Sequence, residues 1–299
     1  MRTINRYGIL HRLLPLMAIV MLMTLGSCAS RSAYVAFANS GVAFNNVMLQ
    51  VSASSRRLTM DRESELLLSQ MSGRTQYQRK ANLDSADSSS RSAVQALNQL
   101  DKCSRLMKSY FDALKALAGT NAPQQIGEEL NAAATNLTNF VKTAQSGDGA
   151  EISAAAPAVS GIAGGLAGFA VDAALKRELN SRAKVLKQAF DLQEFALKEL
   201  VSIVNDGIKT IADKRWVRLV RDPYVSSRLT SASAQNAWIK NRADLALLPN
   251  KAAVISDAKK QLRTMRENFV RLRDGKITAA ELDSFTSQLA TFVGHIKAL

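Results

Sequence analysis

Few side chains in this 299-residue chain are of a type that does covalent chemistry. Outside the N-terminal region the sequence has one cysteine, Cys103, and one histidine, His295. A Cys-His nucleophile needs both side chains within hydrogen-bond reach, but these two lie far apart and form no motif. Cys103 instead falls on an apolar helical stripe, where a free thiol is normally a small buried residue. With no metal-ligand spacing, G-x-S-x-G element or phosphate loop, we expect no catalytic residue, metal or cofactor, and hence no enzyme.

One short segment resembles half of a metal-binding loop. Asp274–Ile277 followed by Glu281 is similar to the second half of an EF-hand calcium loop. The first and third positions of such a loop would be Val270 and Leu272, which have no side-chain oxygen. The same letters fit a helix end followed by a capping box at Thr278 and Glu281, and this interpretation is preferred.

Basic side chains are concentrated in three places. A run of charge is usually a solvated helix face. The middle cluster is distinctive because Trp216 lies within it, and an indole is suited to the headgroup level of an anionic membrane. Its members, Lys214, Arg215, Trp216, Arg218 and Arg221, are therefore candidates for binding an anionic surface. The other two clusters are Lys176, Arg177, Arg182, Lys184 and Lys187, and Lys259, Lys260, Arg263, Arg266, Arg271 and Arg273.

The N-terminus has the layout of a secretory leader. Three arginines within the first 12 residues precede an uncharged apolar stretch over 13–25, and the sequence then reads Leu25, Gly26, Ser27, Cys28. These four residues resemble the lipobox of bacterial lipoproteins, although the resemblance covers only about a tenth of the chain. It implies that Leu25, Gly26 and Ser27 are read by the signal peptidase, that residues 1–27 are removed, and that Cys28 carries a covalent lipid. The alternative is an uncleaved anchor, for which the apolar stretch is short.

The same resemblance implies an address and a class of partner. Ala29 stands where an aspartate would commonly retain a lipoprotein in the inner membrane, so we expect the outer membrane, facing the periplasm or the exterior. Several acyl chains on Cys28 would anchor the protein stably through a tether at 28–33. The formal net charge of +14 falls to about +11 without the leader, which favours anionic partners. In that compartment we expect anionic lipid, glycan or an acidic envelope protein, and not nucleic acid.

Apolar periodicity indicates an all-α fold. Spacings of three and four predict helices over 34–58, 96–117, 123–140, 171–220, 254–272 and 278–296, with Asp222 and Pro223 ending the fourth. The polar stretch 73–92 is a connector or a helical extension, and the region around Trp238 is less regular. Residues 34–299 are therefore expected to form a bundle of long antiparallel helices with coiled-coil-like seams. Such seams can close within one chain or between two copies.

The segment from Ile152 to Val171 has no charged residue and is rich in glycine and alanine. Its glycines, Gly161, Gly164, Gly165 and Gly168, have the spacing that lets helices approach closely. One interpretation is a membrane-inserting hairpin, an arrangement that resembles the hidden segments of helical pore-forming toxins. The other is a buried small-residue helix or a loop, which Pro157 and the small transfer energies of Ala and Gly favour.

These observations together favour a non-catalytic, outer-membrane-anchored binding, adaptor or scaffolding protein of the bacterial envelope. The alternative function is a membrane-active protein, either pore-forming-like or lipid-binding, that uses residues 152–171.

Overall fold

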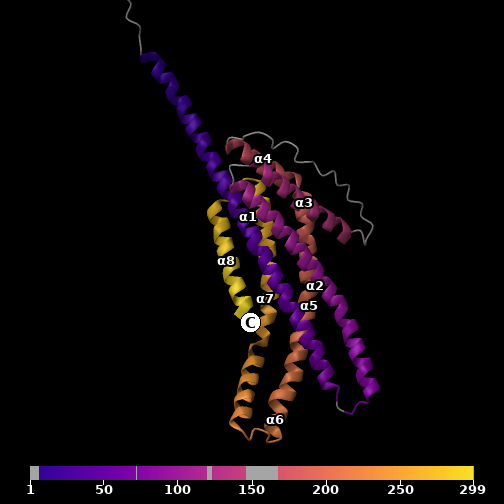
Figure 1. The fold of residues 1–299 in the computed structure, drawn as a ribbon. Coiled ribbons are helices and arrows are strands. Elements are labelled where there is room, and N and C mark those ends of the chain that lie inside the picture. The colour runs from indigo at the N-terminus through magenta and orange to yellow at the C-terminus, as the bar shows by residue number, and fades with distance from the viewer. Residues whose placement is uncertain (1–6, 72, 120–122, 146–167, 299) are drawn as a thin grey trace, which may run out of the picture.

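Seven long helices pack together in the computed structural model, which describes residues 7–71, 73–119, 123–145 and 168–298, with side chains from Arg31 onward. The helices are α1 (Tyr7–Ser69), α2 (Gln76–Gly119), α3 (Pro123–Gln145), α4 (Gly168–Ser181), α5 (Ala183–Arg215), α7 (Ala232–Arg273) and α8 (Ala279–Ala298). A π-helix, η2 (Trp216–Arg221), and the one-turn helix α6 (Asp222–Val225) connect α5 to α7 (Figure 1). The described residues contain no strand, so the predicted all-α bundle is confirmed.

Helix α1 is the common partner of the bundle, and it contacts α2, α5, α7 and α8 (Figure 1). It runs antiparallel to α2, because Arg31 donates to the carbonyl of Ala118 whereas Ser52 donates to that of Leu97. It runs parallel to α8, whose Leu282 and Thr286 contact Ser40, and parallel to α5. Helices α5 and α8 therefore lie parallel to α1, whereas α2 and α7 run antiparallel to it.

The core is a single apolar cluster around aromatic contacts between α1, α2, α5 and α7. The Phe37 ring meets the Phe111 ring edge-on at 5.5 Å and stacks on that of Phe269 at 5.9 Å. Phe190 approaches Phe269 from α5, with ring centroids 6.2 Å apart. The seam predicted for α2 is buried as expected, with Leu100, Cys103, Met107, Tyr110, Leu114 and Leu117 each at most 2 % exposed.

One glycine in α1 permits a close approach to α2 in the core. A Cβ atom added at Gly41 would lie 2.4 Å from the ring of Phe111, well inside van der Waals contact. No side chain larger than hydrogen fits there unless α1 and α2 separate. The sequence analysis did not identify Gly41, because a single glycine carries no periodic signal of its own.

Several helix ends lie where local sequence predicts them. Helix α2 ends at Gly119 and α3 begins at Pro123. Gly275 adopts a φ of +67° after α7, in the left-handed region that glycine enters without penalty. The capping box is also present, since the Thr278 amide donates to Glu281 at 2.8 Å and the Glu281 amide donates to Thr278 at 3.3 Å.

Three parts of the predicted helix pattern need correction. Helix α7 begins at Ala232, so the region around Trp238 is helical, and Pro249 lies inside the helix at an exposed turn where water can satisfy the carbonyl that lacks a donor. The helix predicted over 171–220 is interrupted at Arg182, where ψ is close to 0°. It also does not stop at Asp222, because Pro223 occupies the first turn of α6, where no amide donor is needed.

Of the two alternatives for the polar stretch 73–92, the helical extension is confirmed, because α2 already begins at Gln76. The side chains of the proposed leader 1–27, of Leu25, Gly26 and Ser27, of Cys28 and of the tether up to Ser30 lie outside the described part. The same holds for residues 152–167, including Gly161, Gly164 and Gly165. Gly168 is the first residue of α4.

Candidate functional site at the distal end of the bundle

Large apolar side chains are exposed mainly at one end of the molecule. In the described part of the chain twelve such side chains are exposed, and ten of them fall within residues 60–83 or 212–247. Residues 60–83 comprise the end of α1, the turn that follows it and the start of α2. Residues 212–247, here called the distal arm, comprise the end of α5, η2, α6 and the start of α7. Figure 1 shows both at the same end, which we call the distal end. The ten are Met60, Leu68, Met71, Tyr77, Leu83, Trp216, Tyr224, Val225, Ile239 and Leu247.

The distal arm is held together by contacts around one indole. The Trp238 Nε1–H donates to the carbonyl of Val220 at 2.9 Å, within the π-helix. Its ring stacks on that of Tyr224 with centroids 5.7 Å apart, and the guanidinium of Arg242 lies 5.5 Å from it. Only Val220 is buried within the arm, and it lies outside the main core cluster. A π-helix inserts one extra residue per turn and is frequent at functional sites.

The distal arm is basic, with seven Lys and Arg residues against three Asp residues. The predicted basic cluster falls within it but does not form one free patch. Arg215 and Arg218 both donate to the Glu65 carboxylate, at 2.7 and 2.8 Å, and the Glu65 side chain is 4 % exposed. Arg221 pairs with Asp222 at 2.8 Å.

The predicted residues therefore divide into two roles. Arg215 and Arg218 fix the base of the distal arm to α1, because each compensates the charge of a nearly buried carboxylate. Trp216 is 46 % exposed, and Lys214 is exposed with no carboxylate within ion-pair distance among the described residues. The role of Glu65 could not be found from sequence, since it lies 150 residues from its partner Arg215.

The distal end is remote from the point at which the chain would be anchored. Arg31 lies beside the end of α2, and Cys28 is three residues earlier, a reach of at most about 10 Å. Glu65 contacts the base of the distal arm, and the helical rise places it about 50 Å along α1 from Arg31. A lipid on Cys28 and the distal arm would therefore occupy opposite ends of the bundle.

The residues considered for catalysis are not brought together. Burial raises the pKa of the Cys103 thiol to about 12, and its Sγ contacts the carbonyl of Ala189 at 3.7 Å. His295 is exposed on α8. Among the described residues there is no group of three or more His, Cys, Asp or Glu side chains able to hold a metal, and no helix long and apolar enough to cross a membrane.

An ionic group lies buried near the break between α4 and α5. Arg182 donates to Glu178 at 3.3 Å and to Asn131 at 3.2 Å, and both charged residues are at most 4 % exposed. Burial raises the pKa of Glu178, and burial together with the Glu178 charge raises the pKa of Tyr110. This group orients α4 against α2 and α3 in the interior, where no partner from solution can reach it.

A comparison of the chain with protein-family models, curated proteins and solved structures finds no match. The functional assignment therefore depends on the geometry of the molecule.

Proposed function

We propose that this chain is a non-catalytic, lipid-anchored envelope protein that presents its distal end to an anionic partner. In this proposal the leader is removed, Cys28 holds the protein in the outer membrane, and the helical bundle acts as a spacer. The partner is an acidic envelope protein, an anionic glycan or an anionic lipid, and the protein serves as an adaptor or scaffold.

One observation carries this proposal. Ten of the twelve exposed large apolar side chains lie at the end of the bundle farthest from Cys28. Exposed apolar groups that gather in one region, with basic groups between them, mark interaction surfaces more often than scattered ones do. Trp, Tyr and Arg are also the residue types that contribute most to binding energy at interfaces, and the distal arm contains all three.

The charge of the distal arm supports an anionic partner. Besides its ion-paired arginines, the arm exposes Lys214, Arg228 and Lys240. Lys240 pairs with Asp244 at its own surface, whereas Lys214 and Arg228 have no ion pair among the described residues. Cations of this kind raise the rate of encounter with an acidic partner and make binding depend on salt.

Capture of partners from chemically cross-linked cell envelopes tests the proposal. The bait is the lipidated full chain, compared with a Cys28→Ser form, with a double variant Tyr224→Ser/Val225→Ser, and with Phe195→Ser. Phe195 is the matched control, because it is 66 % exposed but lies on the body of α5 outside the distal end. We expect a discrete partner that is retained by the wild type and by Phe195→Ser and lost by the double variant.

Two results would overturn the proposal. One is a partner that is lost with Phe195→Ser and kept by the double variant. The other is release of dye from anionic vesicles by the purified protein, abolished by Gly164→Leu while the fold is unchanged, which would instead establish the membrane-active function.

A further inference from the structure

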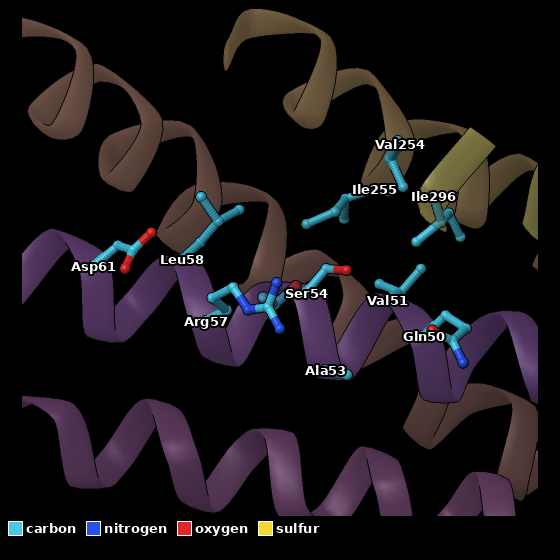
Figure 2. Close-up of a pocket in the computed structure, with 11 residues that line it drawn as sticks. Gln50, Val51, Ala53, Ser54, Arg57, Leu58, Asp61, Val254, Ile255 and Ile296 are labelled. Carbon is cyan, nitrogen blue, oxygen red and sulfur yellow. The ribbon is translucent and has the colours of Figure 1, made fainter. Parts of the chain in front are cut away.

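A pocket of about 280 Å³ lies between α1, α7 and α8, and its rim reaches the base of the distal arm at Asp61 (Figure 2). Helix α8 follows α1 from Ser40 to the level of Val51 and ends at Ala298, whereas α1 and α7 continue beyond it. The pocket occupies the space beside the last turn of α8. Its volume is at the low end of the range for small-molecule sites, which suits one hydrocarbon chain and not a larger ligand.

The lining of the pocket combines aliphatic side chains with the polar residues Gln50, Ser54, Ser55, Arg57 and Asp61. Figure 2 shows Val51 and Leu58 of α1 facing Ile255 and Ile296 from α7 and α8. These four side chains and Val254 are each at most 9 % exposed, so they belong to the core and still leave this space between them. The aliphatic part of such a site gains free energy when a hydrocarbon covers it and removes it from water.

Two polar groups at the pocket lack partners. The Ser55 hydroxyl is buried, and its Oγ has no hydrogen bond among the described residues, although Ser55 lines the pocket on the same helical face as Val51 and Leu58. A buried hydroxyl without a partner costs free energy that a bound acceptor would recover. Arg57 also lines the pocket, is exposed, and has no carboxylate within ion-pair distance in the described part of the chain.

We propose that this pocket binds a single hydrocarbon chain with an anionic head group. The chain lies against the aliphatic walls, and the head group accepts hydrogen bonds from Arg57, with Ser55 as a second donor. The acidic residue at the rim, Asp61, is already engaged by Arg215 at 3.5 Å, which lowers its repulsion of an anion. The aliphatic part of this site lies outside the distal end, although Asp61 at its rim contacts Arg215 of the distal arm, and the test below does not depend on the function proposed for that end.

Photolabelling of the full chain in lipid nanodiscs tests this site. One probe is a fatty acid with a diazirine at its chain end, and the other is a phosphatidylglycerol that bears the same acyl chain. Comparing the two probes distinguishes binding of a free acid from binding of a membrane lipid. Peptide mass spectrometry locates the label. We expect labelling by at least one probe in the peptides containing Ile255 or Ile296, and competition by decanoate but not by decyltrimethylammonium.

Two variants decide which groups bind the ligand. Ile255→Trp fills the pocket, and we expect it to abolish the labelling there. Arg57→Gln should weaken labelling by the anionic probe about fivefold, the effect expected for one partly solvated ion pair, while leaving a matched fatty-alcohol probe unchanged. Arg79→Gln, a substitution of an exposed cation on α2, is the control and should change neither.

Circular dichroism melting of each variant shows that the fold is retained. Because Arg57 is exposed, its substitution leaves the core intact. The Arg57→Gln comparison therefore remains decisive even if Ile255→Trp does not fold. Labelling spread over the surface without competition by decanoate would overturn the proposal. So would equal labelling of the wild type and Arg57→Gln by the anionic probe.

Discussion

The two halves of α7 belong to the same helix but lie in different environments. From Val254 to Leu272 the helix buries a full apolar stripe against α1 and α5, whereas from Ala232 to Leu247 it buries no side chain. The first half is held within the distal arm by Trp238, Tyr224 and Val220, and only the half-buried Leu245 near its end packs against the core cluster. We therefore expect the body of the bundle to provide most of the free energy of unfolding. The exposed groups of the distal arm are expected to contribute little to it.

This difference has a functional consequence. A side chain that is buried in the core cannot contact a partner. In the distal arm Trp216, Tyr224 and Ile239 are exposed, and the fold does not require their burial. A helical body that is stable without them can hold them in place for binding.

The largest contrast should come from removing one ring from the body. Phe37→Ala deletes a side chain that is fully buried between Phe111 and Phe269. It should lower the free energy of unfolding by about 3–5 kcal/mol, from lost apolar burial and the cavity that remains. Urea denaturation of the wild type and the variant, followed by circular dichroism, measures this. A loss below about 1 kcal/mol would mean that the body is not the source of stability.

A smaller effect is expected at the close approach between α1 and α2. Gly41→Ala places a methyl group against the Phe111 ring and should cost about 1–3 kcal/mol, because the helices must move apart. Gly207→Ala is the matched control, since the nearest atom to its Cβ is 3.7 Å away. That control should be neutral or stabilising by up to about 1 kcal/mol, from the better helix propensity of alanine. Equal destabilisation by both would contradict the tight packing at Gly41.

The capping box of α8 should contribute less. Thr278→Ala removes the acceptor of the Glu281 amide and should cost about 1 kcal/mol in the same denaturation experiment. Hydrogen bonds from Arg271 and Thr278 lower the pKa of Glu281 to about 2, from 4.5. Its contribution is therefore present above pH 4.5 and is lost as the pH falls toward 2. Stability of Glu281→Gln should vary less over this range, and an unchanged slope would exclude the capping role.

The smallest effect is expected in the distal arm. Tyr224→Ala removes a ring that is 67 % exposed, and it should change the free energy of unfolding by less than about 0.5 kcal/mol. The stack on Trp238 is its main contact in the arm, and solvent already covers most of the ring. A loss of 2 kcal/mol or more would show that the arm is part of the cooperative core, and the distinction between the two regions would fail.

The body could be predicted from sequence because its signals are local. Buried positions in α2, α3 and α8 recur at helical spacing, and Gly119, Pro123, Gly275 and Thr278 mark helix ends through their own conformational preferences. These preferences act within one or two turns of chain. The capping box and the helices predicted over 96–117, 123–140 and 278–296 are therefore confirmed.

The distal arm could not be predicted in the same way. Its helices face mainly solvent, so the first half of α7 has no apolar stripe, and the sequence around Trp238 shows no regular helical pattern although it is helical. The pairing of Arg215 and Arg218 with Glu65 joins distant parts of the chain and leaves no local pattern. The sequence did identify Trp216 and Lys214, which remain exposed, because their clustering is itself local.

The most direct test of the distal end as the docking region is photocrosslinking in living cells. A photoreactive phenylalanine is introduced at Tyr224 in one strain and at Phe195 in another, both positions being exposed aromatic residues in the otherwise unchanged lipidated chain. We predict a defined crosslinked species from position 224 and none from position 195. A crosslinked species from position 195 alone would contradict the central claim, because the partner would then bind the body of the bundle.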